Sequence, residues 1–141
     1  TYTARNDLNT APIDVTLSNS TIAENSANGT VVGNAIVNDD DTSFTYSLTN
    51  NAGGRFAINS STGQITVANG SLLDFESNTS HSITVQVVDS VGYSFSKVVS
   101  INLSNVNEAP VAVSDTATAI EAGGISNGTA GTNPSGNLLT N

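Results

Sequence analysis

Ser82-Ile83-Thr84-Val85-Gln86-Val87 is the stretch of this chain that most clearly indicates its fold. Apolar and polar residues alternate along it, which places three aliphatic side chains on one face of a strand and three polar ones on the other. Such a strand belongs to a sheet with one buried and one solvated face. The same period of two recurs elsewhere, at Phe44, Tyr46 and Leu48 and at Val99, Ile101 and Leu103.

Six further segments with strand character lie between residues 13 and 104, separated by turn residues. Phe56–Ile58 and Gln64–Val67 flank the turn cluster Asn59–Gly63, which predicts a hairpin. The remaining strands are expected at 13–17, 31–36, 44–48 and 93–103. No segment has helical spacing. We therefore predict an all-β fold, a seven-stranded antiparallel Greek-key β-sandwich of the immunoglobulin-like kind.

Composition and charge limit the classes of partner. The 141 residues carry twelve acidic and three basic side chains, a formal net charge of −9. Because phosphate binding requires a basic surface, no nucleic-acid partner is expected. No apolar run approaches the roughly 18 residues of a membrane span, so no direct membrane insertion of this segment is expected. Cations are the natural partners, although charge alone fits a solvated acidic surface equally well.

An internal repeat predicts the domain boundaries. Asp7-Leu8-Asn9-Thr10-Ala11-Pro12 matches Asn105-Val106-Asn107-Glu108-Ala109-Pro110, and an apolar alternating stretch follows each copy. We expect an upstream linker over residues 1–12 and a complete repeat with its C-terminal linker over 13–110. Residues 111–141 are expected to be the incomplete start of the next repeat.

The acidic residues gather at predicted strand ends and turns, at Glu24, Asp39–Asp41, Asp74, Glu76, Asp89 and Glu108. A sandwich collects its loops at two ends, where clustered carboxylates repel one another unless a cation lies between them. Calcium prefers carboxylate, amide and backbone oxygens, whereas zinc prefers Cys and His. The chain has no Cys and one His, so the pattern favours Ca²⁺.

Five short motifs, taken together and in this order, resemble the cadherin repeats of large bacterial surface proteins. Ala23-Glu24-Asn25 is similar to the family's Pro-Glu-Asn, and Leu73-Asp74-Phe75-Glu76 to its Leu-Asp-x-Glu. Val88-Asp89-Ser90 resembles the acidic end of the sixth strand. The segments 105–110 and 7–12 resemble the family's linker, Asp-x-Asn-Asp-x-Pro.

The resemblance implies calcium between successive repeats, in two sites. The lower site would lie at the C-terminal end of the repeat and the upper site at its N-terminal end. The lower site would use Glu24, Asp74, Glu76 and Glu108, with oxygen from Asn105 and Asn107. The upper site would use Asp7, Asn9, Asp89 and one or more of Asp39, Asp40 and Asp41.

The resemblance further implies a non-catalytic, extracellular or cell-surface adhesion or spacer repeat of a secreted bacterial adhesin. Its expected partners are neighbouring repeats in the same chain, like repeats on other cells, or surface glycans. The alternative is an accessory or glycan-binding module of a secreted polysaccharide-acting enzyme. Asp74 and Glu76 form a carboxylate pair of the kind that hydrolyses glycosides, but a small sandwich with short loops offers no evident substrate cleft.

Overall fold

The computed structural model describes residues 9–110 of the chain. The predicted start of a second repeat at 111–141 lies outside the described residues, as does the candidate ligand Asp7 and most of the predicted upstream linker. Among the residues described, no helix is long and apolar enough to cross a membrane.

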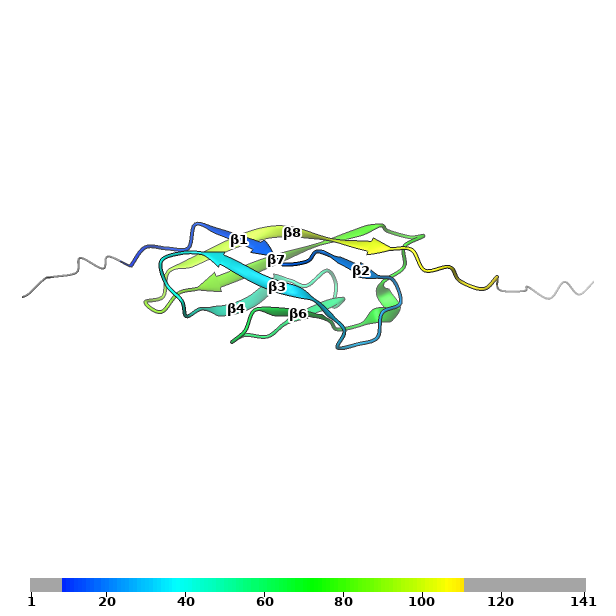
Figure 1. Cartoon of the computed structure of the whole chain (residues 1–141), viewed down its shortest axis with the longest axis horizontal. Coiled ribbons are helices and arrows are strands. Elements are labelled where there is room, and N and C mark those ends of the chain that lie inside the picture. Colours follow the sequence, from blue (N-terminus) through cyan, green and yellow to red (C-terminus); the bar gives the residue numbers. More distant parts are fainter. Residues whose placement is uncertain (1–8, 111–141) are drawn as a thin grey trace, which may run out of the picture. The chain divides into compact units, whose positions relative to one another are not determined.

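Two four-stranded sheets face each other (Figure 1). The first has the order β1 (Asp14–Leu17), β3 (Val31–Asn38), β6 (Gln64–Val67), β5 (Phe56–Ile58). The second has the order β2 (Thr21–Ala23), β8 (Ser94–Ser104), β7 (Ser80–Val88), β4 (Thr45–Asn50). Within residues 9–110, every connection except β5–β6 and β7–β8 passes from one sheet to the other, as in a Greek-key sandwich. The predicted all-β sandwich is confirmed, including the β5–β6 hairpin.

One strand was missed by the sequence prediction, and it is parallel to its neighbour. β2 pairs with β8 in the register Thr21↔Asn102, whereas every other pair is antiparallel within residues 9–110. The chain leaves β1 and crosses to the second sheet without reversing direction, so β2 runs the same way as β8. The crossing lies against Gly33, where an added Cβ would be 2.5 Å from the Asn19 carbonyl oxygen.

The core explains why the alternating stretch at 82–87 decides the fold. Ile83, Val85 and Val87 of β7 are fully buried, and their polar neighbours on the strand are not. They pack against inward-facing residues of both sheets, including Phe56, Ile65 and Ile101. Burying each aliphatic side chain contributes about 1.5–3 kcal/mol, so this layer supplies much of the driving force for folding.

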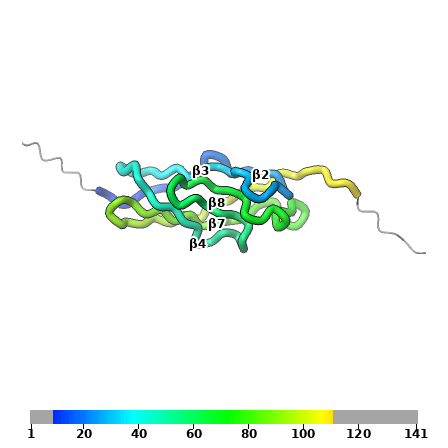
Figure 2. The backbone as a smooth tube through the Cα atoms, turned by 90° about the horizontal axis from the view of Figure 1, so that it is seen from below, coloured from blue at the N-terminus to red at the C-terminus, as the bar shows by residue number. Residues whose placement is uncertain are grey.

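The loops that carry the acidic residues lie at opposite ends of the sandwich. At the upper end, which is on the left in Figure 2, the β3–β4 loop with Asp39–Asp41 lies near the β7–β8 turn that follows Asp89. At the lower end, which is on the right in Figure 1, the segment after β2 lies near the 3-10 helix η1 (Gly70–Leu72) and the end of β8. Each end therefore collects side chains that are far apart in the sequence.

Candidate metal centre

Three carboxylates converge at the lower end. Glu24, Asp74 and Glu76 each offer an oxygen, and these oxygens lie within 4.8 Å of one another. Glu24 directly follows β2, whereas Asp74 and Glu76 follow η1, so two separate loops build the cluster. The cluster presents only oxygen donors, which is the ligand chemistry that Ca²⁺ prefers.

Glu24 is the buried member of the cluster, with 2% of its surface exposed. Its Oε1 accepts a hydrogen bond from the Val106 amide at 2.7 Å, and its Oε2 accepts one from the Phe75 amide at 2.8 Å. These two backbone donors hold the pKa of Glu24 below its ordinary value, with the Val106 amide the larger cause. Glu24 is therefore ionised and fixed in place, and it ties the Asp74 loop to the segment that follows β8.

Asp74 and Glu76 are exposed and held by small polar groups. The Ser77 hydroxyl donates to Asp74 Oδ2 at 2.6 Å, and this bond is the main reason why the pKa of Asp74 lies below its ordinary value. Asn105 Nδ2 donates to Glu76 Oε1 at 2.7 Å. The amide of Asn105 thus lies beside the cluster, within reach of a role as an oxygen donor if its side chain rotates.

The linker residues Glu108 and Asn107 are both exposed. Glu108 Oε1 accepts a hydrogen bond from Asn25 Nδ2, which the sequence interpretation had not included among the site residues. Asn25 has a φ of 55°, a left-handed conformation that Asn tolerates better than most residues. Asn25 directly follows the candidate ligand Glu24 in the Ala23-Glu24-Asn25 motif, and this position is the signal that could have identified it.

Asp89 anchors the upper end. It is 6% exposed, and its Oδ1 accepts backbone hydrogen bonds from Val91, Gly92 and Tyr93 in the β7–β8 turn. Its Oδ2 accepts from Asn9 Nδ2 at 3.2 Å. Asp89 is therefore partly a turn-stabilising residue, with one oxygen left facing the linker.

Two buried oxygens at the upper end have no hydrogen-bond partner, Asn9 Oδ1 and Asp39 Oδ2. Asp40 accepts from the Thr10 hydroxyl at 3.2 Å, and Asp41 accepts from both the backbone and the hydroxyl of Ser90. Burial is the main reason why the pKa of Asp39 is raised. An unpartnered buried carboxylate oxygen is costly, and a cation bound there would satisfy it.

The two ends differ in how tightly they gather acids. Within residues 9–110, only the lower end brings three carboxylates within 4.8 Å of one another. A family model described as "Cadherin domain" matches residues 18–104, which is more than half of the chain. The chain belongs to the cadherin-domain family. Cadherin domains are non-enzymatic adhesion modules of extracellular proteins.

Similar proteins agree with this assignment. The human protein "Cadherin-related family member 2" is 39% identical over 98 residues, which cover 64% of this chain and 8% of that protein. The chicken VE-cadherin EC1-2 structure has a TM-score of 0.56 at 28% identity and covers 67% of this chain and 50% of that one. Human desmocollin-1, at 24% identity and a TM-score of 0.56, supports the fold alone; 70% of this chain and 21% of that chain are covered. The chain thus spans a small part of its curated relative.

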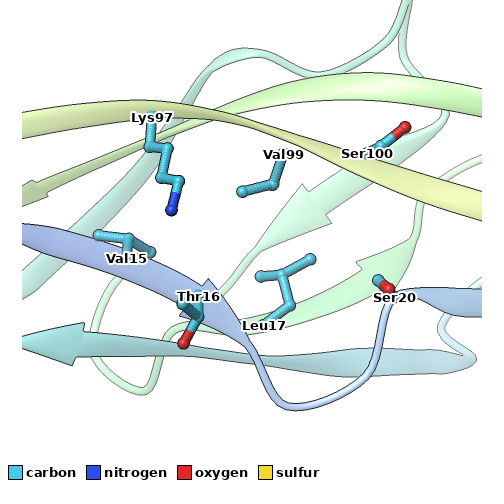
Figure 3. A pocket seen from close by; sticks show the side chains of 7 residues that line it. All are labelled: Val15, Thr16, Leu17, Ser20, Lys97, Val99 and Ser100. Atoms are coloured by element: carbon cyan, nitrogen blue, oxygen red, sulfur yellow. The ribbon is translucent and has the colours of Figure 1, made fainter.

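A hollow of about 260 Å³ lies on the side of the cadherin domain, between β1 and β8 (Figure 3). Its lining combines aliphatic side chains with hydroxyl groups and Lys97, whose ammonium pairs with Asp14 Oδ1 at 2.6 Å. Among the described residues that line it there is no pair of carboxylates, which glycoside hydrolysis would require. The candidate metal ligands lie at the two ends of the sandwich, away from this hollow.

Because one oxygen of Asp39 has no hydrogen-bond partner, a substitution at this position is expected to raise the stability of the domain rather than lower it. Without calcium, Asp39→Asn is expected to stabilise the cadherin domain at pH 7, because it removes the charge of a half-buried carboxylate beside Asp40 and Asp41. Its Oδ1 still accepts the Asp40 amide, as Asp39 does at 2.8 Å. The melting temperature in a chelator should rise by roughly 2–5 °C. The raised pKa of Asp39 leads to the same expectation. A carboxyl group whose pKa is raised in the folded state lowers the stability of the domain as the pH rises and the group ionises.

Asp41→Asn is the matched comparison for Asp39→Asn. It removes a like charge from the same loop and relieves the same repulsion, but an Asp41 oxygen already accepts two hydrogen bonds from Ser90, so a smaller gain in stability is expected than for Asp39→Asn. Differential scanning fluorimetry in a chelator would measure both variants. A lower melting temperature for Asp39→Asn than for the unmodified chain would contradict the expectation.

Proposed function

We propose that this cadherin domain binds Ca²⁺ at its two ends and acts as an extracellular adhesion or spacer repeat. The observation that carries the proposal is the lower cluster, in which Glu24, Asp74 and Glu76 bring three carboxylate oxygens within 4.8 Å of one another. Three negative charges this close repel one another in the absence of a cation. A divalent ion with oxygen preference would remove that repulsion and join the two loops.

The surrounding residues support a ligand set wider than the three acids. Asn105, Asn107 and Glu108 follow β8 directly, so they emerge beside the cluster, and Asn105 already contacts Glu76. At the upper end, the proposed ligands are Asn9, Asp39, Asp40, Asp41 and Asp89, with Asp7 from the preceding segment. The unpartnered oxygens of Asn9 and Asp39 support this second site.

The proposed mechanism is mechanical. The linker after β8 donates its Val106 amide to Glu24 and the Asn105 side-chain amide to Glu76, so the linker already contacts the lower cluster. Calcium bound by the cluster and the linker together would add ligand bonds to these contacts and hold the next repeat in a fixed direction. A string of such repeats would form a stiff rod that projects a binding surface from the cell. Neighbouring repeats are then the first partners.

The cell-surface setting follows from family membership, and its details are part of the proposal. A bacterial surface adhesin, pairing with like repeats on other cells and binding to surface glycans stay predictions from the sequence resemblance.

Calcium titration of Glu76→Gln tests the function directly. Isothermal titration calorimetry of the unmodified chain should show binding in the range of extracellular sites, about 10⁻⁴ to 10⁻³ M. Glu76→Gln should weaken lower-site binding by at least tenfold, because it removes one of three clustered charges and leaves an amide that can offer a single oxygen. Calcium at 100 times the dissociation constant should stabilise the unmodified chain by about 2.7 kcal/mol.

The matched control is Asp14→Asn, which removes the same charge from β1 at a position paired with Lys97 and outside both proposed sites. Its calcium isotherm should resemble that of the unmodified chain. Binding that is absent in the unmodified chain, or equal in Glu76→Gln, would remove the basis for the proposal.

A further inference from the structure

The two loops that carry the lower acids are held together by a series of contacts that involve no charged side chain pair. We call this series the loop contact, formed by residues 24–30 and 67–75. Backbone bonds connect Gly29 with Val67, Val67 with Thr30, and Asn25 with Leu73, at distances of 2.7–3.0 Å. The Gly70 amide donates to Asn28 Oδ1 at 2.8 Å. The loop contact ends at the Phe75 amide, which donates to Glu24.

Gly70 lies in the middle of the loop contact and is buried. A Cβ added to Gly70 would be 1.8 Å from the carbonyl oxygen of Ser26 and 2.9 Å from its carbonyl carbon. Real Cβ atoms do not approach other atoms closer than about 3.0 Å, so the two backbones would have to separate by about 1 Å or more. Both contacting atoms are backbone, and no flexible side chain can relieve the clash.

The position of this clash decides what it would change. Ser26 is two residues after Glu24, and Gly70 is four residues before Asp74. A separation at Gly70 therefore moves the loop of Glu24 relative to the loop of Asp74 and Glu76. Carboxylate oxygens that lie within 4.8 Å of one another would then be spread over a wider gap, and one ion could not bond to all three.

We infer that Gly70, with Asn28 as its hydrogen-bond partner, is a positioning residue that sets the calcium affinity of the lower site by fixing the distance between its two loops. Gly70 has no side chain and therefore offers the ion no side-chain ligand. It permits an approach that any other residue would prevent. The inference rests on the proposed function for its calcium readout, and on the loop contact alone for its structural part.

The chain provides a matched control at Gly33. There an added Cβ would also clash with a backbone carbonyl, at 2.5 Å from Asn19 oxygen, but at the crossing between β1 and β2. Gly33→Ala and Gly70→Ala are thus both crowded by main chain, and only the second adjoins the acids. Asn28 provides a second pair, because Asn28→Ala removes the acceptor for the Gly70 amide and Asn28→Asp retains it.

Calcium titration and amide hydrogen exchange of these four variants test the inference. Gly70→Ala is expected to weaken calcium binding by about 10- to 100-fold, the range seen when groups that orient ligands are changed. Asn28→Ala should weaken it in the same direction, whereas Asn28→Asp and Gly33→Ala should keep affinities near that of the unmodified chain. If Gly70→Ala does not fold, the Asn28 pair decides.

Hydrogen exchange of the Phe75 amide in calcium-free protein separates failure of this inference from failure of the calcium proposal. Protection of that amide should fall in Gly70→Ala and persist in Gly33→Ala, whether or not the chain binds calcium. Unchanged Phe75 protection in a folded Gly70→Ala, or an equal loss of calcium affinity in Gly33→Ala, would overturn the positioning role.

Discussion

Glu24→Gln is expected to abolish calcium binding at the lower end and to loosen the attachment of the linker. Both oxygens of Glu24 accept backbone amides, from Val106 and from Phe75. Glutamine has one oxygen, so one of these amides would face an NH₂ group and lose its acceptor. The loss of stability is larger than for Glu76→Gln. Water can take over the hydrogen bonds of an exposed carboxylate, whereas a buried amide donor is left unpaired.

The pH dependence gives this prediction a second readout. The pKa of Glu24 is lowered by the Val106 and Phe75 amides, so its contribution to stability is present above the usual pKa of a glutamate. That contribution is lost as the pH falls below the ordinary pKa of a glutamate and through the lowered pKa of Glu24. Thermal unfolding in a chelator should show that Glu24→Gln has a flatter dependence over this range than the unmodified chain.

Asp14→Asn again serves as the control for charge, since it removes a carboxylate from β1, away from the linker. Amide hydrogen exchange at Val106 reports the linker directly: protection should be lost in Glu24→Gln and retained in Asp14→Asn. Full Val106 protection in Glu24→Gln would show that Glu24 does not hold the linker.

Phe56→Ala is expected to have the largest effect on stability, about 3–5 kcal/mol. Phe56 is 1% exposed and is among the largest fully buried side chains of the described core. It lies on β5 opposite Val67, and its ring centroid is 6.4 Å from that of His81 on the facing sheet. Truncation would leave a cavity between the sheets, and the melting temperature should fall by more than about 10 °C.

Val98→Ala provides the comparison, because Val98 is an aliphatic residue of the same fold that is 64% exposed on β8. Its effect should stay within about 0.5 kcal/mol, as for most surface substitutions. Urea denaturation followed by circular dichroism would measure both. A cost for Phe56→Ala below about 1 kcal/mol would mean that the two sheets do not pack through this residue.

The strands were predictable wherever their pattern was local. Alternation in β7 predicted the buried set of Ile83, Val85 and Val87, and the turn cluster at 59–63 predicted the β5–β6 hairpin. β2 was missed because it has three residues, none fully buried, and is stabilised mainly by pairing with β8. A strand of that length has no period to detect, and its partner is about 80 residues away in the sequence.

The members of the candidate site were likewise predictable from the sequence, whereas their contacts were not. Residue types and their order in the sequence pointed to Glu24, Asp74, Glu76 and Asp89 as members of metal sites, because acids at strand ends of a sandwich gather at its two ends. The sequence could not show that Glu24 is tied to the Val106 amide, or that Asn25 contacts Glu108. These contacts join positions about 80 residues apart, and the local pattern does not show which side chains meet.

By itself, the sequence determined the all-β class, since that depends on a period of two, and it favoured oxygen-donor chemistry through residue type. The division of the ligands into two groups was a prediction from the family resemblance. Only the tertiary structure decided which acids meet, how closely, and through which neutral residues. The closeness of the lower acids depends on a backbone approach at Gly70 that has no counterpart in local pattern. Distances between loops are set by packing between elements, and packing depends on the whole chain.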